Sequence, residues 1–198
     1  MKNKKFSSID NIINIAKKGD MYILVDDKNR ENEGDLVIPA LNASQKNINF
    51  MAKYGRGLIC LSLTSKQAKK LNLPLMSPVN KSRNQTAFTI SIEARKGVTT
   101  GISAKDRSIT IRTAIKPNVK KNEIVSPGHI FPIISKDGGV LVRAGHTEGS
   151  VDISRLANKN PSAVICEIMN DLGVMAKGKE LFNFAKKHKL KVGKIDDL

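Results

Sequence analysis

Short apolar runs alternate along this chain with segments whose apolar residues recur at the spacing of a helix face, and this alternation limits the fold more than any other feature. The runs are typical of buried strands and occupy residues 21–25, 36–38, 58–63, 87–92, 130–134, 140–142 and 163–169. Helical patterns lie between them. We therefore expect an α+β fold in three layers, in which helices cover a mixed, twisted β-sheet.

Helix-start and helix-stop residues mark the expected helices. Ser8 and Gly19 bracket the first one, and Thr64 followed by Gln67 is typical of a capping box. Further helices are expected at residues 44–55, 64–71, 103–115 and 147–156 and around residues 181–185. Residues 103–115 also alternate like a strand in part, but their start favours a helix.

One hairpin is expected near the middle of the second half. The turn residues Asp137, Gly138 and Gly139 separate the apolar runs 130–134 and 140–142. Glycine and aspartate between two short apolar runs predict two antiparallel strands.

Length and cysteine use limit the class of protein. A chain of 198 residues can bury one substantial core, so we expect one domain spanning 1–198. Cys60 and Cys166 lie in apolar runs and have neither the density of a disulfide framework nor the spacing of a zinc site. This use of cysteine indicates a reducing, cytoplasmic location. Apolar runs are too short to span a bilayer, so no membrane partner is expected.

The formal net charge of +16 raises the alternative of a nucleic-acid-binding module. The lysines are dispersed, however, and the chain has 6 Phe, 2 Tyr and no Trp with which to stack bases. We expect no nucleic-acid partner. A basic surface would instead favour the capture of a small phosphorylated substrate.

The segment 26–35 is locally acidic, with five carboxylates in ten residues of an otherwise basic chain. One interpretation is a solvated hairpin loop, which is what most charged runs are. The other is a magnesium or manganese site, because hard divalent cations prefer oxygen ligands. The acidic segment would also repel nucleic-acid phosphates unless metal intervened.

Two of the three histidines lie beside glycine, in Pro-Gly-His at His129 and in Arg-Ala-Gly-His-Thr at His146. His146 falls where a strand gives way to a helix, whose free N–H groups could bind phosphate, and Arg143 could add an anion contact. Glu167 is a carboxylate inside an apolar strand, so it must point to water, to a partner or into a site.

Six segments together resemble the successive signatures of the 3,4-dihydroxy-2-butanone 4-phosphate synthase family, in family order. They are residues 30–36, 57–60, 97–108, 127–129, 143–148 and 165–169. The resemblance implies a homodimer with shared active sites and a lyase that converts D-ribulose 5-phosphate into L-3,4-dihydroxy-2-butanone 4-phosphate and formate in riboflavin biosynthesis. It also implies two divalent ions, Mg²⁺ or Mn²⁺, in each site.

The resemblance assigns roles residue by residue. Glu31 and His146 become metal ligands, and His129 and Glu167 become essential for catalysis. The implied substrate contacts are Arg30, Glu31, Asp35, Arg143, Ala144, Gly145, His146, Thr147 and Glu167.

The implied chemistry needs a base near neutral pKa that removes the proton next to the ketone, and metal that stabilises negative charge on adjacent oxygens. Asp35, Cys60 and Glu167 are all candidates for this base, and the sequence does not choose among them.

The chain departs from the family pattern at three places, none of them a proposed ligand. Gly149 replaces the usual Ala, Asn158 replaces Gly, and Leu172 replaces an Asp before Gly173. Family members are often fused to a GTP cyclohydrolase II domain, and we expect none here. An inactive relative is a further alternative, which the retained acidic and histidine residues disfavour.

Overall fold

The protein's computed structural model describes residues 6–198, and seven strands form one mixed sheet in the order β4-β5-β3-β6-β2-β1-β7. β1 pairs in parallel with β7, and β3 pairs in parallel with β5, whereas the other neighbours are antiparallel. The strands are β1 (Tyr22–Val25), β2 (Gly34–Pro39), β3 (Cys60–Leu63), β4 (Ile92–Ala94), β5 (Ile124–Ile134), β6 (Ser162–Glu167) and β7 (Val192–Lys194).

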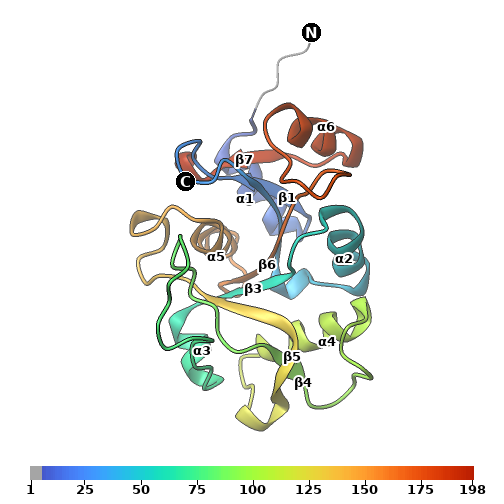
Figure 1. Cartoon of the computed structure of the whole chain (residues 1–198), viewed down its shortest axis with the longest axis vertical. Helices are drawn as coiled ribbons and strands as arrows, with labels where there is room; N and C mark the ends of the chain where they lie inside the picture. Colours follow the sequence, from blue (N-terminus) through green and yellow to red (C-terminus); the bar gives the residue numbers. More distant parts are fainter. Residues whose placement is uncertain (1–5) are drawn as a thin grey trace.

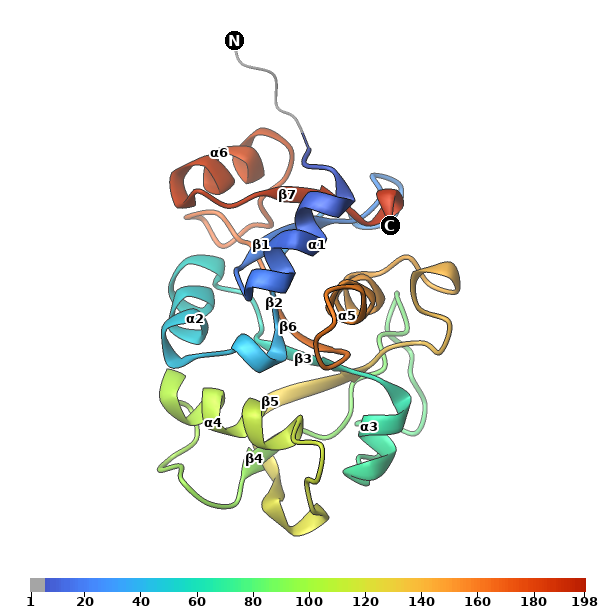
Figure 2. The ribbon, with the colours of Figure 1, turned by 180° about the vertical axis from the view of Figure 1, so that it is seen from behind.

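Helices cover the sheet on both sides, so the expected three-layer α+β architecture is confirmed (Figures 1 and 2). The helices are α1 (Ile9–Lys18), α2 (Gln45–Phe50), which continues as the π-helix Met51–Gly55, α3 (Ser65–Lys70), α4 (Ala104–Ala114), α5 (His146–Leu156) and α6 (Lys179–His188). Short 3₁₀ turns occupy Ala40–Asn42, Lys121–Glu123, Gly139–Leu141 and Ile195–Asp197. No helix of the described residues is long and apolar enough to cross a membrane.

Two separate apolar cores lie on the two faces of the sheet, because successive side chains of a strand point to opposite faces. On β1, Ile23 contributes to the core under α2, α4 and α6, while its neighbour Leu24 contributes to the core under α1 and α5. β2 divides in the same way between Leu36 and Val37. Figure 1 shows α2, α4 and α6 to one side of the sheet and α5 to the other.

The expected caps form the helix ends. The Ser8 side chain accepts a hydrogen bond from the Asn11 N–H at 3.4 Å, and Gly19 ends α1 at a φ of 80°. Ser103 caps α4 by accepting from the Asp106 N–H at 3.0 Å. The helical interpretation of residues 103–115 is therefore confirmed.

The predicted hairpin of residues 130–134 and 140–142 is wrong. The first run is the end of β5, whose neighbours are β3 and β4. The second run folds into the 3₁₀ turn Gly139–Leu141, and the Val140 N–H donates to the Asp152 carboxylate at 2.8 Å. Both edges of β5 are already paired, so no edge remains for a hairpin partner.

The strand predicted at residues 87–92 is displaced, because the regular strand β4 begins at Ile92. Residues 87–89 run beside β5, with Thr89 N–H donating to Pro132 C=O at 2.9 Å and Ile134 N–H donating to Ala87 C=O at 3.0 Å. Pro132 has no N–H to donate in return, and this interrupts the ladder.

Candidate active site

Two carboxylates from adjacent strands face the layer that contains α5. Asp35 on β2 and Glu167 on β6 are direct partners in the antiparallel ladder. They share strand parity with Val37 and Ile165, which belong to the core under α1 and α5. The sheet therefore brings together two side chains that are far apart in the sequence.

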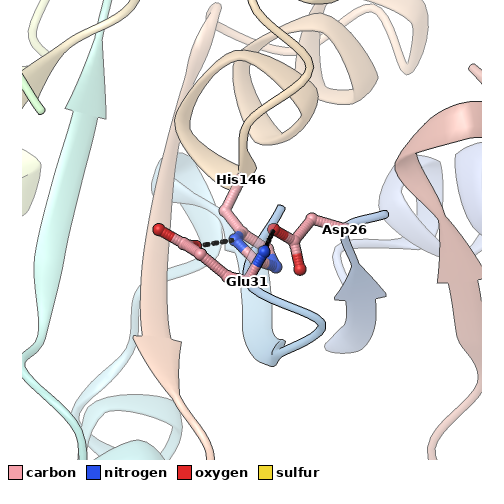
Figure 3. A group of neighbouring side chains, drawn as sticks. All are labelled: Asp26, Glu31 and His146. Carbon is pink, nitrogen blue, oxygen red and sulfur yellow. Dashed lines mark hydrogen bonds and ion pairs between the residues drawn. The ribbon is translucent and has the colours of Figure 1, made fainter. Parts of the chain in front are cut away.

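His146 completes this arrangement from the other side. It is the first residue of α5, with Gly145 as the N-cap. Its imidazole is buried, and Nε2 lies 4.0 Å from Asp35 Oδ1 while Nδ1 lies 3.7 Å from Glu31 Oε2. Glu31 comes from the acidic loop between β1 and β2, so loop, sheet and helix meet here (Figure 3).

The acidic loop is folded around one carboxylate that the sequence did not single out, Asp26. Its Oδ1 accepts from the Glu33 N–H at 2.9 Å, and its Oδ2 accepts from the Glu31 N–H at 3.1 Å and from Arg30 Nη1 at 2.7 Å. A buried carboxylate with three donors is well satisfied. The acidic segment is therefore an ordered hairpin loop between the antiparallel strands β1 and β2, and its Asp26 is buried at the site.

Asp26, Glu31 and His146 each offer a ligand atom, and these atoms all lie within 4.8 Å of one another. His146 Nε2 is buried and has no hydrogen-bond partner among the described residues. An unpartnered imidazole nitrogen beside carboxylate oxygens is costly unless a cation or ligand satisfies it. These residues therefore fit a hard divalent cation, and they include both predicted ligands, Glu31 and His146.

The three candidate bases have different environments. Burial raises the pKa of Asp35 to about 7, an effect that nearby His146 reduces and that Glu167 and Glu31 add to. Burial also raises the pKa of Glu167, although its Oε2 accepts the Leu58 N–H at 2.8 Å. Burial raises the pKa of the Cys60 thiol well above its usual value, with Glu167 and Asp35 adding to the effect.

A pocket of about 170 Å³ opens at this cluster. Seven of the residues expected to bind substrate or metal line it, namely Arg30, Glu31, Asp35, Arg143, His146, Thr147 and Glu167. No individual role was predicted for the other lining residues, which are Glu33 of the acidic segment and Thr86, Phe88, Ile133 and Ile165. Most of these are ordinary apolar residues that only the fold brings to the pocket.

Arg143 is fixed beside the pocket by a buried partner. Its Nη1 donates to Glu148 Oε2 at 2.7 Å, and Glu148 is only 1% exposed. Gly145 leaves room for this pair, because a Cβ there would collide with the guanidinium. The expected segment Ala144 and Gly145 thus lies between two lining residues without lining the pocket itself.

Two expected catalytic residues do not line this pocket. Cys60 is buried on β3, opposite Ile165, with 2% of its surface exposed. His129 lies on β5 and is exposed, and its Nδ1 is 2.8 Å from Glu93 Oε2 on β4. The glycine-rich segment 97–103 lies beside this second cluster, since a Cβ at Gly101 would collide with Glu93 and His129.

The fold and the site define a three-layer α+β protein whose pocket carries the donor set of a divalent-cation site. The model of the 3,4-dihydroxy-2-butanone 4-phosphate synthase family matches residues 10–198. The chain belongs to this family.

The names of similar curated proteins are consistent with membership of this family. The chain is 53% identical over 196 residues to the riboflavin biosynthesis protein RibBA of Aquifex aeolicus. The aligned residues cover 98% of this chain and 48% of that protein. It is 46% identical to a 3,4-dihydroxy-2-butanone 4-phosphate synthase of Wigglesworthia glossinidia brevipalpis, over 96% of this chain and 89% of that protein. The chain spans about half the length of several curated relatives it matches.

A solved structure of 3,4-dihydroxy-2-butanone 4-phosphate synthase in complex with two magnesium ions has the same fold. Its TM-score is 0.91 at 38% sequence identity, covering 97% of this chain and 94% of that chain.

Proposed function

We propose that this chain is a carbon–carbon lyase of riboflavin biosynthesis that converts D-ribulose 5-phosphate into L-3,4-dihydroxy-2-butanone 4-phosphate and formate. The proposed path is metal-assisted enolisation followed by skeletal rearrangement. The observation that carries the proposal is the convergence of Glu31, Asp35, His146 and Glu167 on one small pocket in a chain of this family.

Glu31 and His146 would hold Mg²⁺ or Mn²⁺, and two ions per site are proposed by analogy with the relative that is named as a complex with two magnesium ions. A bound divalent cation stabilises the negative charge that enolisation develops on adjacent substrate oxygens. Asp26 keeps the loop folded, because its oxygens are occupied by the Arg30 side chain and two backbone N–H groups.

Asp35 is the proposed base of the enolisation. It takes the proton from the carbon next to the ketone, and the electron pair stays on the substrate as the enediolate. A pKa of about 7 lets a carboxylate be both ionised and basic at neutral pH. Cys60 is a poor candidate for this role, since a buried thiol with a raised pKa stays protonated.

Arg143, Thr147 and the first turn of α5 are proposed to hold the anionic end of the substrate. The first N–H groups of a helix have no partner within the helix, and they carry the positive end of its dipole. Arg30 would add a second cation from the acidic loop at the same pocket.

We propose further that the functional unit is a homodimer with shared active sites, located in the cytoplasm. Its support is the position of His129, which lies outside the pocket of its own chain. A second copy would supply His129 to the pocket. The chain is proposed to form one synthase domain.

The decisive assay is release of formate from ribulose 5-phosphate with Mg²⁺ present, followed by loss of that activity in excess EDTA. In parallel, Mg²⁺ should raise the melting temperature, because a ligand that binds only the native state stabilises it. Glu31→Ala and His146→Ala should lose both effects while remaining folded. Glu180→Ala, at an exposed acid outside the site, should keep both. Full turnover in excess EDTA contradicts the proposal.

A further inference from the structure

His129 forms a close pair with a carboxylate outside the pocket, Glu93. The Nδ1 atom of His129 lies 2.8 Å from Glu93 Oε2, and the backbone N–H of His129 donates to the same oxygen at 3.1 Å. The Glu93 side chain is 12% exposed, whereas the His129 side chain is 43% exposed. One end of the imidazole is thus fixed inside the protein, and the ring reaches solvent.

The carboxylate itself is anchored from its other oxygen. Thr110 on α4 donates its hydroxyl to Glu93 Oε1 at 3.1 Å, and the same hydroxyl accepts from the Ala94 N–H at 3.0 Å. The pair therefore rests on a helix and on two strands. Groups held by rigid elements keep their geometry better than groups on a free loop.

The local backbone is shaped to allow this contact. A Cβ at Gly128 would collide with the backbone of Ile92, so only glycine lets β5 come this close to β4 next to His129. Gly101 has a φ of +90°, and a Cβ there would collide with the pair itself. The glycine beside His129 therefore allows the close approach of strands β4 and β5.

An ionised carboxylate can only accept hydrogen bonds, so Nδ1 must carry the proton in this contact. The neutral imidazole then has its lone pair on Nε2. We propose that Glu93 is a positioning residue that holds His129 in the Nδ1–H tautomer and so presents Nε2 as a proton acceptor to the substrate. The inference deepens the proposed function and rests on it for the identity of the substrate.

The proton step balances without another reactant. Nε2 takes a proton from a hydroxyl group of the phosphorylated hydroxyketone, and the electron pair of the broken O–H bond stays on the substrate oxygen. The resulting imidazolium has the Glu93 carboxylate across Nδ1 as its partner. Removing the carboxylate would free the imidazole to adopt the other tautomer, in which Nε2 carries a proton and cannot accept one.

The first test is nitrogen NMR of the histidine side chains in the full-length protein, without substrate. Only three histidines contribute signals, and loss of one signal in His129→Gln assigns it. We expect the Nδ1–H form of His129 in the wild type and in Glu93→Gln, whose amide oxygen can still accept. We expect Glu93→Met to shift His129 toward the Nε2–H form. An Nε2–H form in the wild type overturns the inference.

The second test is steady-state kinetics of the same variants. Loss of a residue that hydrogen-bonds to a functional histidine and orients it typically lowers activity by about 10- to 100-fold. The kcat of Glu93→Met should therefore fall by about that factor, while KM stays within about twofold. Glu93→Gln should retain more activity than Glu93→Met. The matched control is Glu123→Met, at a carboxylate bonded to Lys116 beside the same strand pair, and it should keep wild-type kcat.

A double-mutant cycle separates positioning from general stability. In the His129→Gln background, Glu93→Met should cost no further activity, because Glu93 acts only through the imidazole. Independent, multiplying losses overturn the inference. A wild type with the Nδ1–H form that releases no formate refutes the proposed function alone. Formate release that survives Glu93→Met despite the shifted tautomer refutes the role of Glu93 alone.

Discussion

Asp26 and Asp35 both lie close to His146, yet the hydrogen bonding of the two carboxylates differs. Asp26 accepts three hydrogen bonds from donors in its own loop. Asp35 is buried, and its nearest basic group is His146, at 4.0 Å. Burial without a full set of donors disfavours the charged form of a carboxylic acid, which is why the pKa of Asp35 is raised to about 7.

This raised pKa predicts a pH dependence of stability in the metal-free protein. Between pH 3.8 and about 7, folded Asp35 holds a proton that the unfolded chain has lost. The contribution of this proton to the free energy of unfolding is therefore fully present below pH 3.8 and is lost as the pH rises through about 7. The side chain of Asn is neutral at every pH. The unfolding free energy of Asp35→Asn should therefore increase relative to that of the wild type as the pH rises from 3.8 to about 7.

Urea unfolding in EDTA, followed by circular dichroism at several pH values, measures the difference between the two proteins. Adding Mg²⁺ at alkaline pH should restore stability to the wild type more than to Asp35→Asn, because the cation favours the ionised carboxylate. A difference that is constant with pH would show that Asp35 ionises normally in the folded protein.

Sequence patterns predicted the residues that line the pocket better than the residues that hold functional side chains or loops in place through hydrogen bonds. His146 stood out as a glycine-flanked histidine, and Glu31 stood out from the other carboxylates of the acidic run through the family resemblance. Asp26 and Glu93 did not, because each acts through a contact that only the tertiary structure defines. A carboxylate in a loop or strand looks the same in sequence whether it faces water or holds a histidine.

At the scale of elements, helices were predicted more accurately than strand partners. A cap is a contact between residues three apart, so Ser8 and Ser103 mark their helices locally. A strand partner is not local, since Phe131 on β5 pairs with Cys60 on β3, 71 positions earlier in the chain. The false hairpin arose because turn residues and a short apolar run are also compatible with a 3₁₀ turn, which residues Gly139–Leu141 form.

The N-terminus of α5 gives a prediction about both substrate binding and stability. A Cβ in Gly145→Ala collides with the Arg143 guanidinium and would push it from Glu148. The KM for ribulose 5-phosphate should rise by about tenfold, equivalent to about 1.4 kcal/mol of lost binding. The melting temperature should fall, because buried Glu148 loses its charged partner. Steady-state kinetics and thermal unfolding measure both.

Gly149→Ala is the matched control in the same helix. A Cβ at this position would meet Ile195 and Leu24 at 3.4 and 3.5 Å, which is ordinary van der Waals contact. Alanine in a helix interior is favoured over glycine by about 0.5–1 kcal/mol, so this variant should be more stable and keep its KM. An unchanged KM in Gly145→Ala would mean that Arg143 does not contact the substrate.

At the scale of the molecule, the chain carries two groups of candidate catalytic residues in separate places. One is the pocket with Glu31 and His146, where β2, β6 and α5 meet. The other is the pair of Glu93 and His129 on β4 and β5, at the opposite end of the strand order from β1 and β7. Within one chain, His129 does not line the pocket. A homodimer with shared sites would place the second group of one chain at the pocket of the other.

Mixing two inactive variants tests this arrangement directly. Glu31→Ala and His129→Ala should each release no formate as pure homodimers. If each site combines Glu31 of one chain with His129 of the other, a heterodimer of the two variants has one intact site and one site that lacks both residues. Random exchange makes about half of the dimers heterodimers, so formate release should recover to about a quarter of the wild-type rate.

Mixing Glu31→Ala with His146→Ala is the control, and it should recover nothing, because both residues belong to the same pocket. Failure of the first mixture, with heterodimers verified by mass spectrometry, would place His129 in the site of its own chain.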